Sequence, residues 1–278
     1  MYMLIFIRQV TAMLGFSVGF IGAGNMASAI LNGALRCQAV RPEFVYLSDP
    51  LPEKADSFRA QGVHVTTSNV EVVDAADIIV LAIKPQMFEA VLPELAGHTE
   101  GKCVVSIAAG ISSDYILSRL PGIHLIRAMP NTPLQIGKGM TSLTRCNDVS
   151  DALFDAVTEL FRAAGETVVV TEDQINAVIA LSGSSPAYFF RFANAMVQKG
   201  KELGLEEDIA LKLTALAMEG AAGMLTKSGK TAEELTRQVC SPGGTTLAAL
   251  TAFDDAGLDN TVAEAMERCV HRAEELQK

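Results

Sequence analysis

The first part of the chain repeats one pattern of apolar and polar positions. Val18–Ile21 is a short apolar run, Gly22–Gly24 is a turn of small residues, and Asn25–Arg36 carries apolar side chains at helical spacing. A short apolar run before a glycine turn predicts a buried strand, and a spacing of three and four residues predicts a helix. This segment therefore predicts a strand, a turn and a helix in direct succession.

The alternation of strand and helix continues to about residue 170. Strands are predicted in residues 44–50, 63–67, 76–85, 102–110, 124–133, 139–145 and 166–170, and helices in residues 52–62, 86–95, 112–120 and 150–164. Such alternation indicates an α/β fold with a doubly wound, mostly parallel sheet covered by helices on both faces. After Thr171 the strand-like runs stop, and segments rich in Ala, Leu, Met and Glu predict an all-α second half.

The glycine turn is the first motif along the chain that indicates a binding function. Gly22, Gly24 and Ala27 form a GxGxxA pattern between the predicted strand and helix. In this pattern the first glycine permits the tight turn, the second lets the backbone approach a pyrophosphate, and the alanine lets the helix pack closely on the strand. A plain glycine loop is the alternative. The strand before it and the helix after it favour a Rossmann domain that binds a dinucleotide, over residues 13–170, followed by a helical domain over residues 171–278.

Composition narrows the class of partner. The 278 residues are 49% hydrophobic, which supports a sizeable core, and the formal net charge is −10. An acidic chain has no general electrostatic attraction to nucleic acid or to an anionic membrane. We therefore expect small-molecule chemistry, with no nucleic-acid and no membrane partner.

The five cysteines and four histidines are widely scattered. An odd cysteine number without a CxxC pair argues against a disulfide framework and against a zinc site. The histidines form no cluster with metal-ligand spacing. We therefore predict no metal and a cytoplasmic location.

The first dozen residues stand apart from this pattern. Their apolar run is shorter than the ~20 residues of a membrane span, Arg8 interrupts it, and no basic segment precedes it as in a signal peptide. We expect residues 1–12 to be an N-terminal extension and Met13 to be the functional start.

Two stretches of the second half contain further turn residues. Residues 181–190, LSGSSPAYFF, read either as a turn between helices or as part of a site. In residues 240–253, Ser241 and Pro242 introduce a turn before two glycines and two threonines. The N–H groups of Gly244, Thr245 and Thr246 at a helix N-terminus would form a carboxylate pocket. The alternative is a capped helix start, with Thr245 or Thr246 as the N-cap.

Six motifs together resemble the pyrroline-5-carboxylate reductase family, in this order and spacing. They are GFIGAGNMASAI at 19–30, AIKPQ at 82–86, SIAAGI at 106–111, RAMPNTP at 127–133, SGSSPAY at 182–188 and VCSPGGTTLAAL at 239–250. The resemblance implies reduction of L-1-pyrroline-5-carboxylate to L-proline with NADPH or NADH, the last step of proline biosynthesis. It also implies an intertwined homodimer, which in this family often assembles further into a decamer, with each site between one subunit's Rossmann domain and its partner's helices.

The resemblance also implies the site residues. The pyrophosphate of the cofactor would lie on Ile21, Gly22, Ala23, Gly24, Asn25 and Met26. The rest of the cofactor would contact Asn69 at a ribose, Ala82, Lys84 and Pro85 at a strand end, and Ile107, Ala108 and Ala109 at the nicotinamide. The substrate would contact Ser241, Gly243, Gly244, Thr245 and Thr246. Without the resemblance, Lys84 reads as a solvated lysine and Asn69 as a helix cap.

Thr246 is our candidate catalytic residue. A protonated cyclic imine is already electrophilic, so hydride transfer needs orientation and desolvation more than a strong acid. We expect the Thr246 hydroxyl to hydrogen-bond or protonate the imine nitrogen, with water as the final proton source. Because a threonine hydroxyl is a poor acid at neutral pH, a purely positional role is the alternative.

Three residues depart from the family pattern or bear on the cofactor. Ser185 stands where the family more often has glycine, and serine there either tightens the loop around the substrate or only changes a helix cap. Gly229 stands where some relatives contribute an acidic side chain, and we leave it out of the site. Asp49 follows the second strand, where a carboxylate bonds a ribose 2′-hydroxyl and repels a 2′-phosphate, which favours NADH. The alternative is that Asp49 only caps the turn before Pro50.

Two other functions fit parts of the pattern. β-Hydroxyacid dehydrogenases have a similar domain plan, but a lysine follows their substrate-loop glycines, whereas in this chain no lysine follows SGSSPAY until Lys199. A binding protein that has lost turnover is the second alternative. A degraded SPGGTT loop would favour it, and in this sequence the loop is intact.

Overall fold

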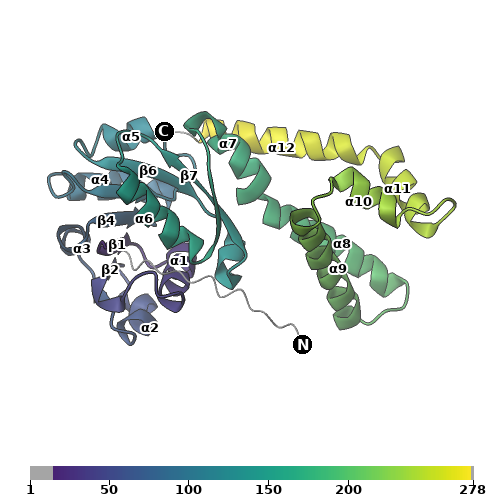
Figure 1. Cartoon of the computed structure of the whole chain (residues 1–278), viewed down its shortest axis with the longest axis horizontal. Coiled ribbons are helices and arrows are strands. Elements are labelled where there is room, and N and C mark those ends of the chain that lie inside the picture. The colour runs from purple at the N-terminus through teal and green to yellow at the C-terminus, as the bar shows by residue number, and fades with distance from the viewer. Residues whose placement is uncertain (1–14, 277–278) are drawn as a thin grey trace. The chain divides into compact units, whose positions relative to one another are not determined.

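The computed structural model describes residues 15–276, and the predicted extension and its start at Met13 lie outside the described residues. The chain divides into two compact units (Figure 1). The first unit holds the chain up to Gly183 and again from Val270, and the second unit holds Ser184–Cys269.

One eight-stranded sheet forms the centre of the first unit, in the order β3-β2-β1-β4-β5-β6-β7-β8. All neighbouring pairs are parallel except β6 and β7. The carboxyl ends of β2, β1, β4 and β5 therefore lie along one edge. The strands are β1 (Val18–Ile21), β2 (Val45–Ser48), β3 (His64–Thr66), β4 (Ile78–Leu81), β5 (Cys103–Ser106), β6 (His124–Met129), β7 (Gly139–Arg145) and β8 (Gly165–Val169).

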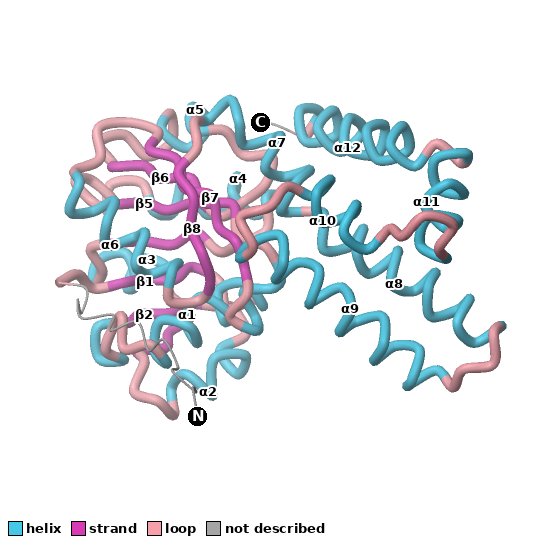
Figure 2. The backbone as a smooth tube through the Cα atoms, turned by 45° about the vertical axis from the view of Figure 1, so that its right-hand side comes forward, coloured by secondary structure: helices cyan, strands magenta, loops and turns pink. Residues whose placement is uncertain are grey.

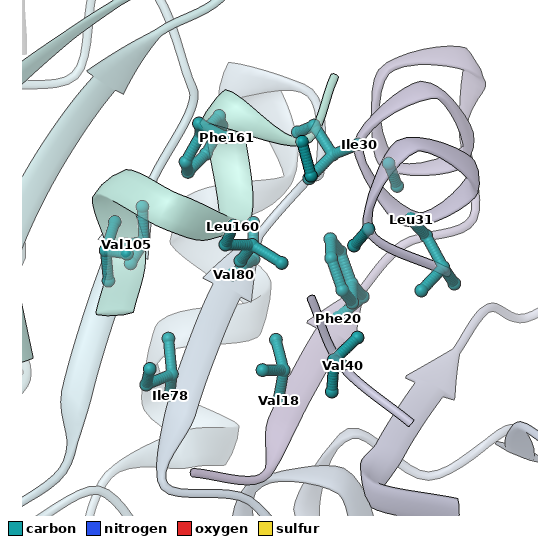
Figure 3. Close-up of a cluster of buried hydrophobic side chains, with 14 of the residues drawn as sticks. Val18, Phe20, Ile30, Leu31, Val40, Ile78, Val80, Val105, Leu160 and Phe161 are labelled. Carbon is teal, nitrogen blue, oxygen red and sulfur yellow. The ribbon is translucent and has the colours of Figure 1, made fainter. Parts of the chain in front are cut away.

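Helices cover both faces of the sheet, because alternate residues of the central strands point to opposite sides. Phe20 and Val80 pack with Leu160 on one face, where α1 and α6 lie (Figure 3). Ile79 and Leu81 belong to the second core, with α3, α4 and α5. The predicted doubly wound, mostly parallel sheet is confirmed. The helices of this unit are α1 (Asn25–Arg36), α2 (Asp56–Arg59), α3 (Asn69–Ala75), α4 (Phe88–Leu95), α5 (Ser113–Leu117), α6 (Asp151–Arg162) and α7 (Ile175–Val178).

The second half is helical after β8 throughout the described residues, as predicted (Figure 2). Residues 181–190 form a break: the π-helix Ile179–Gly183 ends there and α8 begins. The helices are α8 (Ser185–Glu202), α9 (Glu207–Lys227), α10 (Ala232–Val239), α11 (Thr245–Asp255) and α12 (Leu258–Glu275), of which α12 continues into the first unit. By length and composition alone α9 is apolar enough to cross a membrane, and 11% of its most apolar window is buried within the chain.

The link between β6 and β7 explains the antiparallel pair. A parallel pair needs a crossover of about a dozen residues or more. Here the chain runs from Met129 to Gly139 through the short 3₁₀-helix Thr132–Ile136. It therefore reverses direction at this point of the sheet.

Candidate active site

Gly22 makes the turn after β1 possible. Its φ is +99°, and a Cβ at this position would lie 2.8 Å from the carbonyl oxygen of Ala82. Its N–H donates to the Ser48 carbonyl at 2.7 Å. The turn is therefore fixed against the ends of β2 and β4, and only glycine fits it without strain.

Gly24 leaves the start of α1 open. It is the N-cap of α1, no side chain caps the helix, and the first turn contains no acidic residue. A Cβ on Gly24 would meet no protein atom within 4 Å. The first-turn N–H groups of α1 have no partner inside the helix, and they lie at the positive end of its dipole. The pyrophosphate of a dinucleotide fits this arrangement of glycine turn and open helix N-terminus.

Asp49 lies beside the glycine turn, at the end of β2. The residue is 7% exposed. Its carboxylate accepts the N–H of Ala23 and the N–H of Leu51, each at 2.9 Å. Lys54 approaches it at 3.6 Å. The carboxylate therefore closes the turn at Pro50, as the alternative interpretation held, and also holds the glycine turn. No pattern in the sequence indicates the contact with Ala23.

Asn69 is the first residue of α3. The interpretation as a helix cap is wrong, because the N-cap is Ser68, whose Oγ accepts the N–H of Glu71 at 3.2 Å. The Asn69 amide is oriented instead by two side chains that the sequence did not indicate: the Ser48 hydroxyl donates to its Oδ1 at 2.7 Å, and its Nδ2 donates to Glu94 at 3.0 Å. A fixed amide therefore lies beside the end of β2.

The remaining predicted cofactor residues follow β4 and β5. The Ala82 N–H donates to the Ile21 carbonyl at 2.9 Å. Lys84 is exposed and directly precedes the 3₁₀-helix Pro85–Met87. After β5, Ala108 is buried and Ala109 is exposed. The structure thus brings all the predicted cofactor residues to the carboxyl edge of β2, β1, β4 and β5, where ligands bind in sheets of this kind.

The predicted substrate loop lies in the second unit, before α11. The N-cap of α11 is Gly244, and no side chain caps the helix, so the interpretation of Thr245 or Thr246 as N-cap is wrong. The N–H of Gly244 donates to the Ser241 carbonyl at 3.0 Å, so it is not one of the open donors that we expected. Thr245 and Thr246 begin α11, and their N–H groups have no partner inside the helix.

The two glycines of this loop have separate structural reasons. Gly243 has a φ of +69°, which favours glycine. A Cβ on Gly244 would lie 2.4 Å from the Ser241 hydroxyl. Ser241 therefore lies so close to the start of α11 that a side chain at position 244 would displace its hydroxyl.

The departures from the family pattern cause no backbone strain. Ser185 is the first residue of α8 and is not among the residues with positive φ, so serine fits there. Gly229 has a φ of +70° in the turn between α9 and α10, where glycine is favoured.

The cysteines are all free thiols. Burial raises the pKa of Cys103 to about 12, and burial together with nearby Glu172 raises the pKa of Cys146 to about 12. Both are therefore unreactive at neutral pH. Within residues 15–276 no group of three His, Cys, Asp or Glu side chains is placed to hold a metal ion.

Comparison with known proteins identifies the family. Residues 172–276 match the model "Pyrroline-5-carboxylate reductase dimerisation", and residues 17–110 match "NADP oxidoreductase coenzyme F420-dependent". Pyrroline-5-carboxylate reductase of Escherichia coli is 39% identical over 264 residues, which cover 94% of this chain and 98% of the relative. The chain belongs to the pyrroline-5-carboxylate reductase family. It is accordingly an oxidoreductase that acts on a CH–NH bond with a nicotinamide dinucleotide, and it contains a domain through which this family forms oligomers.

Solved structures of the family have the same fold. A pyrroline-5-carboxylate reductase from Coxiella burnetii has a TM-score of 0.88 at 34% identity, and covers 95% of this chain and 99% of its own. The Plasmodium falciparum enzyme, whose structure has NADP bound, has a TM-score of 0.87 and covers 96% of this chain and 100% of its own. At 24% identity this second likeness shows the fold alone.

Proposed function

We propose that this chain reduces L-1-pyrroline-5-carboxylate to L-proline with NAD(P)H, as the last step of proline biosynthesis. The similarity to the Escherichia coli reductase over 98% of that protein's length carries the proposal. The open start of α11 after Gly243 and Gly244 supports it, because it provides hydrogen-bond donors for the carboxylate of the substrate.

The cofactor residues follow from the strand order. We assign the pyrophosphate to Ile21–Met26, at the glycine turn and the start of α1. Because β2 and β4 lie on opposite sides of β1, the ribose nearer Asp49 and Asn69 belongs to the adenosine half. The nicotinamide half then extends past Ala82, Lys84 and Pro85 to Ile107, Ala108 and Ala109.

The substrate residues hold the imine for reduction. Ser241 and Gly243 shape the loop, and Gly244 closes its turn, while the N–H groups of Thr245 and Thr246 bind the substrate carboxylate. When bound, NAD(P)H supplies the hydride that reduces the imine carbon. The Thr246 hydroxyl hydrogen-bonds the imine nitrogen, which takes its proton from water. Orientation and exclusion of water account for the catalysis, and no strong acid is needed.

Asp49 sets the cofactor preference in this proposal. Its buried carboxylate lies at a strand end of the kind where an adenosine ribose binds, and the Lys54 ammonium is 3.6 Å away. A 2′-phosphate beside this carboxylate would be repelled, so NADH is preferred over NADPH.

The helical half forms a homodimer, and the dimers assemble into a decamer. Large apolar side chains of the second unit are more than half exposed in the single chain, among them Phe189, Phe190, Leu213, Leu216 and Val239. Exposed apolar surface of this extent marks an interface. We assign α9 to this interface and not to a membrane, which agrees with the match of residues 172–276 to a dimerisation domain.

The functional division of the chain follows the same reasoning. We assign cofactor binding to residues 13–170, and dimerisation and substrate binding to residues 171–278. The free thiols fit a reducing cytoplasm. The net charge of −10 argues against nucleic acid and anionic membranes as partners.

The test is a reductase assay with purified protein. We expect pyrroline-5-carboxylate to cause loss of NAD(P)H absorbance and to yield one proline for each dinucleotide oxidised. Binding of both ligands without oxidation would overturn the proposal and favour the binding protein without turnover. Oxidation of NAD(P)H with a β-oxo acid as substrate and a β-hydroxyacid as product, and none with pyrroline-5-carboxylate, would favour the other dehydrogenase family.

A further inference from the structure

The Glu172 side chain joins three segments of the first unit that are far apart in the sequence. Its carboxylate accepts the N–H of Ser113 at 3.1 Å and the Ser113 hydroxyl at 2.7 Å. It also accepts a guanidinium N–H of Arg127 at 2.9 Å. The three segments are the end of the loop after β5, the strand β6, and the start of the 3₁₀-helix Glu172–Gln174 that leads into α7.

Two of the three partners in this cluster are buried. Arg127 is 5% exposed and Ser113 is 7% exposed, whereas the Glu172 side chain is 34% exposed. All three line a polar cavity of about 340 Å³. Burial acts to raise the pKa of Glu172, but the hydrogen bonds from Ser113 and Arg127 outweigh it, and the pKa is lowered. Glu172 is therefore charged at neutral pH, and the contacts with Ser113 and Arg127 are charge-assisted.

The loop of residues 107–112, which we call the β5 loop, connects β5 to Ser113, the first residue of α5. At its beginning, Ser106 lies opposite Arg127 in the register of β5 and β6. At its end, Ser113 donates twice to Glu172. Between these ends Ala109 is exposed, while Gly110 lies close against the backbone of Leu276, so that an added Cβ would be 3.0 Å from the Leu276 oxygen.

We infer that Glu172 is a positioning residue, whose carboxylate holds the β5 loop in the place where the nicotinamide end of the cofactor lies. The inference rests on the proposed function, in which Ile107, Ala108 and Ala109 contact the nicotinamide. Glu172 itself contacts neither cofactor nor substrate. It acts through Ser113, the first residue after the loop, and Arg127 holds the Glu172 carboxylate in place.

The physical reason is that hydride transfer tolerates little misplacement of the reacting atoms. Reacting atoms must lie about 3–3.5 Å apart, and a shift of about 1 Å costs up to about a hundredfold in rate. The hydrogen bonds at the start of the β5 loop are long: the Ile107 N–H donates to the Leu81 carbonyl at 3.4 Å, and the Ala108 N–H donates to the Ser106 hydroxyl at 3.4 Å. Such long hydrogen bonds are weak. The charge-assisted contacts of Glu172 with Ser113 therefore add to the burial of Ile111 in fixing the loop.

The test compares two ligands that differ only at the nicotinamide end. ADP-ribose contains the adenosine and the pyrophosphate of NADH and lacks the nicotinamide. In Glu172→Gln we expect ADP-ribose to bind within about twofold of its wild-type affinity, while NADH loses about tenfold, which corresponds to about 1.4 kcal/mol. In the reductase assay kcat falls about tenfold or more, because the misplaced ring reacts more slowly.

Matched variants separate positioning from general damage. Glu159→Gln removes a glutamate that pairs with Arg162 on α6, and it should change neither affinity. Ser113→Ala removes the hydroxyl donor and keeps the backbone N–H, so we expect a smaller loss in the same direction. Amide hydrogen exchange of a peptide covering residues 107–113 should rise in Glu172→Gln and Ser113→Ala and stay unchanged in Glu159→Gln.

Two results would overturn the inference. One is an equal loss of ADP-ribose and NADH affinity in Glu172→Gln, which means that the whole cofactor domain is damaged. The other is unchanged NADH affinity together with unchanged exchange in the β5 loop. The binding and exchange measurements use no pyrroline-5-carboxylate, so they give an answer even where the proposed reduction fails.

Discussion

The Asp49 carboxylate accepts the backbone N–H of Ala23 at 2.9 Å, so an acidic side chain after β2 holds the glycine turn after β1. The same carboxylate accepts the N–H of Leu51 at 2.9 Å. In the proposed cofactor assignment the same buried residue also faces the adenosine ribose. The proposal therefore couples the geometry of the turn to the choice of dinucleotide.

Asp49→Asn and Asp49→Ser separate the two roles. Both variants remove the charge, so the ratio of kcat/KM for NADPH to that for NADH should rise about fivefold or more, since like charges about 4 Å apart repel by about 1 kcal/mol even in water. Asn keeps a hydrogen-bond acceptor of similar size, so Asp49→Ser should also weaken the binding of both dinucleotides more than Asp49→Asn does. An unchanged ratio in both variants removes Asp49 from cofactor choice.

Gly24→Ala and Gly22→Ala should behave differently, although both lie in the glycine turn. Gly24 has a φ of −71°, and an added Cβ meets no protein atom within 4 Å, so Gly24→Ala should keep its melting temperature. In the proposed assignment its methyl group lies where the pyrophosphate approaches, so the Kd for NAD(P)H should rise about tenfold or more.

Gly22→Ala places its Cβ against the Ala82 carbonyl at a positive φ, which costs about 1–2 kcal/mol for the conformation alone. We expect it to lower the melting temperature as well as the affinity. Calorimetry with and without dinucleotide measures both quantities. A loss of stability in Gly24→Ala would contradict the assignment of its open side to the cofactor.

Local pattern was enough to predict most elements of the first unit. The predicted strand Val18–Ile21 and helix Asn25–Arg36 have the observed bounds, because each apolar position there packs into one of the two cores. The strand predicted at 76–85 is shorter in the structure, Ile78–Leu81, since Pro85 begins a 3₁₀-helix.

Contacts between distant residues were not predictable from the sequence. Ser113 and Glu172 are 59 positions apart, and Ala23 and Asp49 are 26 apart, so only the packed sheet brings them together. The helix start at Thr245 was predicted, but its N-cap was not, because capping depends on the φ and ψ of one residue, and Gly244 adopts the extended conformation.

Thr246→Val tests the proposed role of the hydroxyl. Valine keeps the size and branching of threonine and removes the hydrogen bond to the imine nitrogen, so we expect kcat to fall about a hundredfold with unchanged Kd for NAD(P)H. Thr246→Ser should recover most of the activity. Thr251→Val is the matched control, since Thr251 lies in the same helix and its hydroxyl bonds only the Leu247 carbonyl at 3.0 Å among the contacts described. Wild-type turnover in Thr246→Val would remove the hydroxyl from the mechanism.

The stability that Glu172 contributes should depend on pH in a defined direction. Its pKa is lower in the folded chain than the value of about 4.3 that an unperturbed glutamate has. A lowered pKa means that the contribution is complete above the unfolded value and is lost as the pH falls through the folded value. The free energy of unfolding of Glu172→Gln should therefore lie below that of the wild type at neutral pH, and the difference should shrink below about pH 4.

Urea unfolding at one fixed protein concentration measures this difference, because an oligomer's stability depends on concentration. Ser113→Ala should show a smaller difference with the same pH dependence, since it removes one donor to the Glu172 carboxylate. Ser118→Ala removes a hydroxyl that bonds the Tyr115 carbonyl beside α5 and gives the baseline for losing a serine hydroxyl in this region. A difference between Glu172→Gln and wild type that stays constant from neutral to acidic pH would contradict the role of the charged carboxylate. In that case the shape of the side chain, and not its charge, would hold the β5 loop.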